Sequence, residues 1–120
     1  MKILNIDDST VNNMLMENII SSFGYEAYSL LQGSGIAEKI EEYQPDVIIL
    51  DLMMPDKSGF DVLDELNKLG FNIPVIVVTA MNSSELKRRA LEMGAVDYQA
   101  KPVNMKSLKR SLDKAFQGEA

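Results

Sequence analysis

The chain has 120 residues, 46% of them hydrophobic and 25% charged, which is typical of one globular domain spanning residues 1–120. It contains neither cysteine nor histidine, so disulfides, zinc–thiolate sites and histidine-based catalysis are excluded, and any chemistry falls to carboxylates, hydroxyls and lysines. The net charge of -6 argues against direct nucleic-acid binding, and no apolar stretch approaches the ~20 residues that cross a bilayer. We therefore expect a cytoplasmic protein that is not inserted in a membrane.

Strand and helix patterns alternate along the chain. Short apolar runs predict five strands, at residues 3–6, 25–30, 47–50, 73–78 and 96–100. A helical pattern follows each run, and helices are predicted after Ser9 or Thr10, over 36–43 and 60–69, after Asn82 or Ser83, and after Asn104. Five such units with short links predict an α/β fold, a doubly wound, flavodoxin-like parallel sheet in the order 2-1-3-4-5 with helices on both faces.

The first predicted helix has apolar residues at helical spacing. These residues keep a spacing of about 3.6 residues, and they are Val11, Met14, Leu15, Ile19 and Phe23.

Charged residues follow three of the predicted strands. Asp7 and Asp8 follow the first strand, Asp51 follows the third, and Lys101 follows the fifth. The predicted strand order places the carboxyl ends of the first and third strands side by side, so the three acids should meet. Carboxylates that close repel one another unless a cation intervenes, and a hard ion such as Mg²⁺ fits these ligands. The alternative is that each Asp is a helix cap or an ordinary loop residue.

Four segments together resemble a known family. They are the acidic pair at residues 7–8, the run 47–55 followed by Gly59, the pair Thr79-Ala80, and residues 95–102 with their Lys-Pro end. In this order and at these strand ends, they resemble the receiver domain of two-component response regulators, of the single-domain chemotaxis kind. The resemblance extends from residue 1 to about residue 116.

The resemblance implies a role for each site residue. Asp51 would be the phosphoacceptor, a nucleophile that takes a phosphoryl group from a phosphohistidine. Asp8, Asp51 and the backbone carbonyl of Met53 would hold Mg²⁺, with Mn²⁺ as a substitute, and Asp7 would hold a metal-bound water. Lys101 would serve as the counter-charge once the phosphoryl group arrives, and the Thr79 hydroxyl would contact another phosphoryl oxygen. Such a protein catalyses its own phosphorylation and dephosphorylation, without substrate turnover in the usual sense.

The resemblance also implies partners and a switch. Because the chain has no histidine, the phosphohistidine must belong to another protein, a sensor histidine kinase or a histidine phosphotransfer protein. Phosphorylation would draw Thr79 inward and let Tyr98 turn in from solvent, changing the face made by the fourth helix, fifth strand and fifth helix, where a downstream protein would bind. The alternative for Tyr98 is an ordinary half-buried strand residue.

Three other functions remain open. A degenerate receiver would act as a phosphorylation-independent interaction module, although the full set of site residues argues against it. A phosphohydrolase of the haloacid dehalogenase type would need an Asp two residues after Asp51, where this chain has Met53. A flavodoxin-like flavin binder would show flavin absorbance. We expect no effector domain after residue 116, so the chain is either a stand-alone regulator or an excised receiver.

Overall fold

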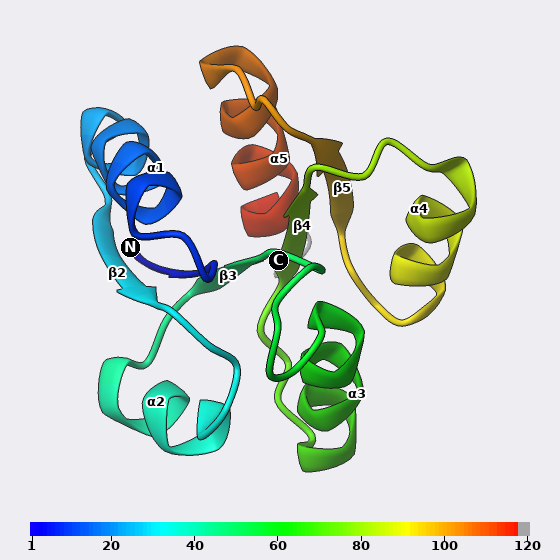
Figure 1. Ribbon diagram of the computed structural model, residues 1–120. Helices are drawn as coiled ribbons and strands as arrows, with labels where there is room; N and C mark the ends of the chain where they lie inside the picture. Colours follow the sequence, from blue (N-terminus) through cyan, green and yellow to red (C-terminus); the bar gives the residue numbers. More distant parts are fainter. Residues whose placement is uncertain (118–120) are drawn as a thin grey trace.

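The computed structural model describes residues 1–117, which form a parallel sheet flanked by helices (Figure 1). The strands are β1 (Lys2–Ile6), β2 (Glu26–Leu30), β3 (Val47–Leu50), β4 (Val75–Thr79) and β5 (Asp97–Ala100). The helices are α1 (Thr10–Ser22), α2 (Ile36–Tyr43), α3 (Gly59–Leu69), α4 (Ser84–Glu92) and α5 (Met105–Gln117). Strand and helix alternate throughout, as the apolar runs predicted.

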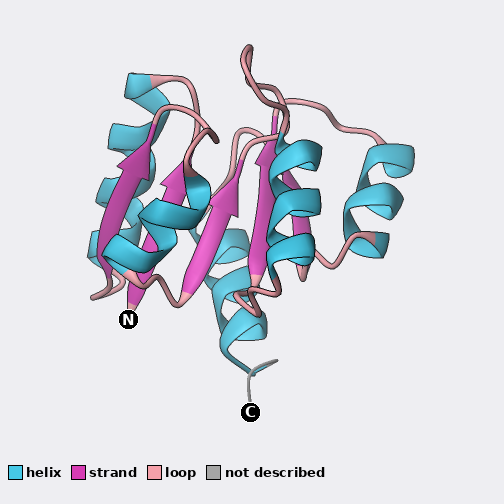
Figure 2. Cartoon of the chain, turned by 90° about the horizontal axis from the view of Figure 1, so that it is seen from below, coloured by secondary structure: helices cyan, strands magenta, loops and turns pink. Residues whose placement is uncertain are grey.

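The five strands are parallel and lie in the order β2-β1-β3-β4-β5. Figure 2 shows all the strand arrows pointing the same way. Ile6 of β1 lies opposite Leu50 of β3, and the Asp51 N–H donates to the Ile6 carbonyl at 3.0 Å. The predicted fold and strand order are therefore confirmed, and the chain leaves β1 and β3 at neighbouring points of one sheet edge.

Helices cover both faces of the sheet. In Figure 1, α1 and α5 lie on one side of the sheet, and α2 and α3 lie on the other. Alternate strand residues face opposite layers, so Ile3 belongs to a core cluster with residues of α1 and α5, whereas Leu4 belongs to a cluster with residues of α2, α3 and α4. β3 is buried along its whole length because both of its faces are covered.

Side-chain caps set where several helices begin. The hydroxyls of Ser9, Ser58 and Ser83 accept backbone N–H bonds from the first turns of α1, α3 and α4, each at 3.2 Å. The Asn104 side chain accepts the Ser107 N–H at 2.8 Å at the start of α5. Of the alternatives that the sequence left open, the caps are therefore Ser9 and Ser83.

The apolar residues at helical spacing do not all lie on the buried face of α1. Val11, Met14 and Leu15 are more than half exposed, and the buried residues of α1 are Asn13, Met16 and Ile20. Apolar residues occur on much of this helix, so their spacing alone does not select one face. The buried face combines apolar packing by Met16 and Ile20 with hydrogen bonds of Asn13 inside the protein.

Among the helices of residues 1–117, none combines the length and the apolarity that a bilayer crossing requires.

Candidate functional site

Three carboxylates meet at the carboxyl edge of the sheet. Asp7 and Asp8 follow β1 and Asp51 follows β3, and one oxygen from each lies within 4.8 Å of the others. Asp7 and Asp51 are 4% and 6% exposed, whereas Asp8 is open to solvent. We call these three residues the acid cluster. Their approach confirms the expectation from strand order that the acids meet.

Backbone groups hold the two buried carboxylates. Asp7 Oδ1 accepts the Ser9 N–H at 2.9 Å, and Asp51 Oδ1 accepts the Met53 N–H at 3.2 Å. The loop after Asp51 returns close to β3, since the Gly59 N–H donates to the Leu52 carbonyl at 3.0 Å. A Cβ at Gly59 would lie 2.5 Å from the Asp51 carbonyl oxygen. A side chain there would therefore push the backbone that carries Asp51.

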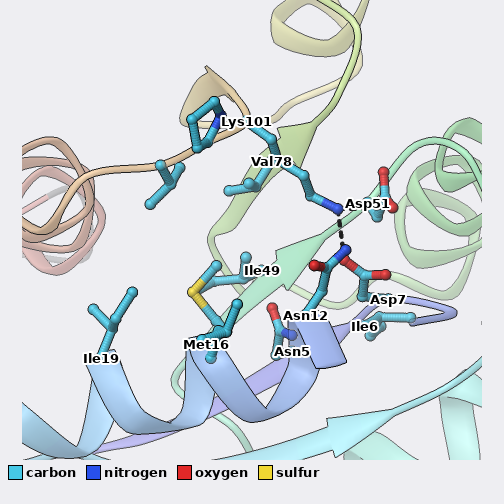
Figure 3. Close-up of a pocket in the computed structure, with 13 residues that line it drawn as sticks. Asn5, Ile6, Asp7, Asn12, Met16, Ile19, Ile49, Asp51, Val78 and Lys101 are labelled. Carbon is cyan, nitrogen blue, oxygen red and sulfur yellow. Dashed lines mark hydrogen bonds and ion pairs between the residues drawn. The ribbon is translucent and has the colours of Figure 1, made fainter. Parts of the chain in front are cut away.

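Lys101 reaches the acid cluster from the end of β5. Its Nζ lies 2.7 Å from Asp7 Oδ2 and 3.3 Å from Asp51 Oδ2, and Figure 3 shows the side chain extending toward both carboxylates. Burial by itself would lower the pKa of Lys101. The hydrogen bonds and negative charges of Asp7 and Asp51 outweigh burial, so the pKa of Lys101 is raised.

Lys101 pairs with Asp7 and Asp51 in the structure, although the resemblance implied only a contact with a phosphoryl group. The pairing is electrostatic, because clustered carboxylates attract the nearest cation. The contact of Lys101 with a phosphoryl group stays a prediction. The Lys101-Pro102 peptide bond that follows is cis.

Thr79 and Tyr98 lie on the neighbouring strands β4 and β5. Thr79 is fully buried at the end of β4, and its Oγ1 accepts the Met81 N–H at 3.4 Å. Tyr98 is 8% exposed, and its hydroxyl donates to the Met81 carbonyl at 2.5 Å. Burial raises the pKa of Tyr98, and a backbone group at Ser83 partly offsets this rise. Both side chains thus contact the segment that joins β4 to α4.

The position of Tyr98 differs from the expected starting point of the switch. The resemblance implied a side chain that turns in from solvent on phosphorylation, and the structure has the inward position. The turn on phosphorylation stays a prediction. The hydrogen bond to the Met81 carbonyl stabilises this position, because it satisfies the hydroxyl while the ring is buried.

A cleft of about 380 Å³ adjoins the acid cluster on the α1 side. Asp7, Asp51 and Lys101 line its mouth, and apolar side chains such as Met16 and Val103 line much of the rest. Figure 3 shows Met16, Ile19 and Ile49 on the side of the cleft away from the carboxylates. The site is therefore charged where β1, β3 and β5 end and apolar between α1 and the start of α5.

Comparison with known proteins identifies the family. A family model described as the response regulator receiver domain matches residues 3–113. The chain belongs to this receiver family. The receiver is 32% identical over 114 residues to the chemotaxis protein CheY of Thermotoga maritima, and the match covers 94% of this chain and 95% of that protein. It is also 35% identical over 121 residues to "Probable transcriptional regulator ycf27" of Porphyridium aerugineum, but spans only 50% of that relative.

Solved structures agree with this assignment. The BeF3-activated N-terminal receiver domain of Klebsiella pneumoniae RstA matches with a TM-score of 0.90 at 25% identity, covering 98% of this chain and 99% of that one. A response regulator receiver domain protein from Clostridium thermocellum matches with a TM-score of 0.89 at 28% identity, covering 98% and 95%. The family that the sequence motifs suggested is thus confirmed, and this receiver serves in two-component signalling.

One polar pair at the receiver site was not predicted from the sequence. Asn5 in β1 and Asn13 in α1 are 3% and 4% exposed. Asn5 donates a hydrogen bond to Asn13, and Asn13 donates one to the Asp7 carbonyl. The available signal was a single asparagine inside the otherwise apolar run of residues 3–6. A buried amide in a strand needs a partner, and the sequence alone does not identify it.

Proposed function

We propose that this chain, as one receiver domain over residues 1–120, accepts a phosphoryl group on Asp51 from a phosphohistidine of another protein in the cytoplasm. The observation that carries the proposal is the arrangement around Asp51. Its carboxylate is buried, lies in the acid cluster with Asp7 and Asp8, and has Lys101 Nζ at 3.3 Å. A nucleophile, candidate cation ligands and a counter-charge are therefore together at one sheet edge.

The proposed reaction is a phosphoryl transfer. A carboxylate oxygen of Asp51 attacks the donor phosphorus, an O–P bond forms and the N–P bond to the donor imidazole breaks. The electron pair of the broken bond stays on the imidazole nitrogen, which takes up a proton. Because such transfers depend chiefly on alignment and on neutralising oxygen charge, the chain's part is to hold Asp51 in place and to offer positive charge near it.

The acid cluster suits a hard divalent cation. Asp8, Asp51 and the Met53 carbonyl would hold Mg²⁺ or Mn²⁺, with Asp7 binding a metal-bound water, because these ions prefer oxygen ligands. The ion would neutralise charge on the phosphoryl oxygens. Within residues 1–117, Lys101 is the lysine that pairs with this cluster, and it reaches Asp7 and Asp51 but not Asp8. The surplus of negative charge supports cation binding.

Lys101 and Thr79 are the proposed contacts for the phosphoryl oxygens. Lys101 is placed to exchange a carboxylate partner for a phosphoryl oxygen, since its Nζ already lies beside Asp51. The Thr79 hydroxyl is buried and accepts a long hydrogen bond of 3.4 Å from the Met81 N–H, a bond that does not use the hydroxyl proton. That proton would be donated to a phosphoryl oxygen.

The proposed output is a change of the face made by α4, β5 and α5. Thr79 and Tyr98 both contact Met81 in the segment between β4 and α4, so a move of Thr79 reaches Tyr98 through that segment. The partners would be a sensor histidine kinase or a phosphotransfer protein as donor and a downstream protein at this face, with no direct nucleic-acid or membrane binding.

The test is phosphorylation by acetyl phosphate in the presence of Mg²⁺, followed by intact mass measurement. We expect one phosphoryl adduct on the wild-type chain and none on Asp51→Asn. The matched control is Asp56→Asn, an exposed acid in the same loop that hydrogen-bonds Ser34 at 3.1 Å, and it should keep the adduct. An unmodified wild-type chain would overturn the proposal and favour a phosphorylation-independent interaction module.

A further inference from the structure

We propose that Asn13, oriented by Asn5, is a positioning residue for the acid cluster. This inference rests on the proposed cation site and names residues outside that ligand set. Asn5 Nδ2 donates to Asn13 Oδ1 at 2.6 Å, and both side chains are buried. With its oxygen held in this way, Asn13 presents its own NH₂ group to the loop that follows β1.

The Asn13 amide holds the peptide group between the two acids. Its Nδ2 donates to the Asp7 carbonyl at 2.9 Å and lies 3.4 Å from the Leu30 carbonyl. The Asp7 carbonyl and the Asp8 N–H belong to one planar peptide group. Fixing that plane therefore fixes the direction in which the chain enters Asp8.

The remaining polar groups of Asp7 are held by other elements. Its N–H donates to the Leu30 carbonyl at 3.1 Å, one carboxylate oxygen accepts from Ser9, and the other lies near Lys101. The remaining polar group of Asp7 is its backbone carbonyl, which accepts a hydrogen bond from Asn13. Asp8 itself is exposed, so its placement toward the cation depends on this peptide more than on packing.

The buried amides of Asn5 and Asn13 lie in otherwise apolar surroundings. The neighbouring residues on this face of the sheet are apolar, as with Ile3 and Ile49, and Asn5 and Met16 line the same cleft. Replacing both partners of the Asn5–Asn13 hydrogen bond by apolar groups of similar shape removes that bond at little cost, but it also leaves the buried Asp7 carbonyl without its donor. The Asn13 donor therefore serves the Asp7 peptide group rather than the packing of the core.

The test compares metal binding with stability in the double variant Asn5→Leu/Asn13→Leu. Mn²⁺ binding is measured by electron paramagnetic resonance of the free ion, and stability by thermal unfolding without metal. We expect a melting temperature lowered by about 5 °C, because the Asp7 carbonyl loses its donor, and Mn²⁺ binding about tenfold weaker, as when outer partners of metal ligands are removed. Wild-type Mn²⁺ affinity in the folded double variant would overturn the inference.

A single variant and a matched control complete the test. Asn5→Leu removes only the orienting partner and should weaken Mn²⁺ binding about threefold, so it decides the matter if the double variant does not fold. Ser111→Ala removes a buried hydroxyl bonded to Asp97 and should leave Mn²⁺ affinity unchanged. An equal loss in Ser111→Ala would overturn the inference, because it would then reflect general loosening.

These outcomes separate the inference from the proposed function. Failure of the wild-type chain to bind Mn²⁺ would remove the proposed cation site, and the inference with it. Wild-type binding together with unchanged affinity in both asparagine variants would overturn the inference alone.

Discussion

The acid cluster and the polar network at β5 and α5 both hold carboxylates at the border of the core, yet their surroundings differ. In the second, which we call the Asp97 network, Asp97 accepts from the Tyr98 N–H at 2.9 Å and from the Ser111 hydroxyl at 2.6 Å. Gln99 then donates to Ser111 and to the Ser107 carbonyl. In this network, one negative charge, that of Asp97, is stabilised by neutral hydrogen-bond donors.

The acid cluster instead concentrates charge. Lys101 pairs with two of the three carboxylates, Asp7 and Asp51, so the folded chain holds like charges together at some cost in stability. The two regions therefore differ in how negative charge is balanced. Asp97 has neutral donors within the fold, whereas the acid cluster carries more negative charge than Lys101 neutralises, and the proposed cation would supply the rest.

The largest expected effect is that of Mg²⁺ on the acid cluster. Added at about 100 times its Kd, Mg²⁺ should raise the free energy of unfolding by about 2.7 kcal/mol, because it binds only the folded state. Urea titrations with and without Mg²⁺ measure this gain. Asp8→Asn should lose most of it, and an undiminished gain in that variant would contradict the assignment of Asp8 as a ligand.

Lys101→Met should have the next largest effect. It leaves the carboxylates without their cation, and a loss of about 2 kcal/mol without Mg²⁺ is expected, less than for a fully buried pair because the Lys101 side chain is 23% exposed. The pKa of Lys101 is raised above 10.5 in the fold, so its stabilisation is complete below that pH and is lost as pH rises further. Chemical denaturation across that range measures the difference between wild type and variant, which should shrink above pH 10.5. A difference that grows instead would mean that Lys101 does not stabilise the fold through its charge.

The smallest expected effect is that of Ser111→Ala on the Asp97 network. Removal of this hydroxyl should lower stability by about 1.5 kcal/mol, because Asp97 and Gln99 each lose a partner. The Mg²⁺ gain should match that of the wild-type chain in the same urea titrations. A reduced gain would show that the two regions are coupled, and the distinction between them would fail.

Most of the fold and much of the candidate site could be predicted from the sequence. Continuous apolar runs such as residues 47–50 predicted buried strands, and the alternation of strands with helices left few possible topologies. The acids and Lys101 could be predicted at one edge because strand ends are local features of the sequence. The meeting of Asp7, Asp8 and Asp51 then followed from strand order.

The face of α1, the pairing of Lys101 and the inward position of Tyr98 could not be predicted in this way. The positions of Lys101 and Tyr98 depend on contacts between residues far apart in the chain, as between Lys101 and Asp7 or between Tyr98 and Met81. The sequence by itself thus determined the elements, their order and the charges at their ends, because periodicity and composition are local properties. Only the tertiary structure decided which partner each polar group takes, since burial makes a hydrogen bond or an opposite charge necessary and the assembled fold decides what lies within reach.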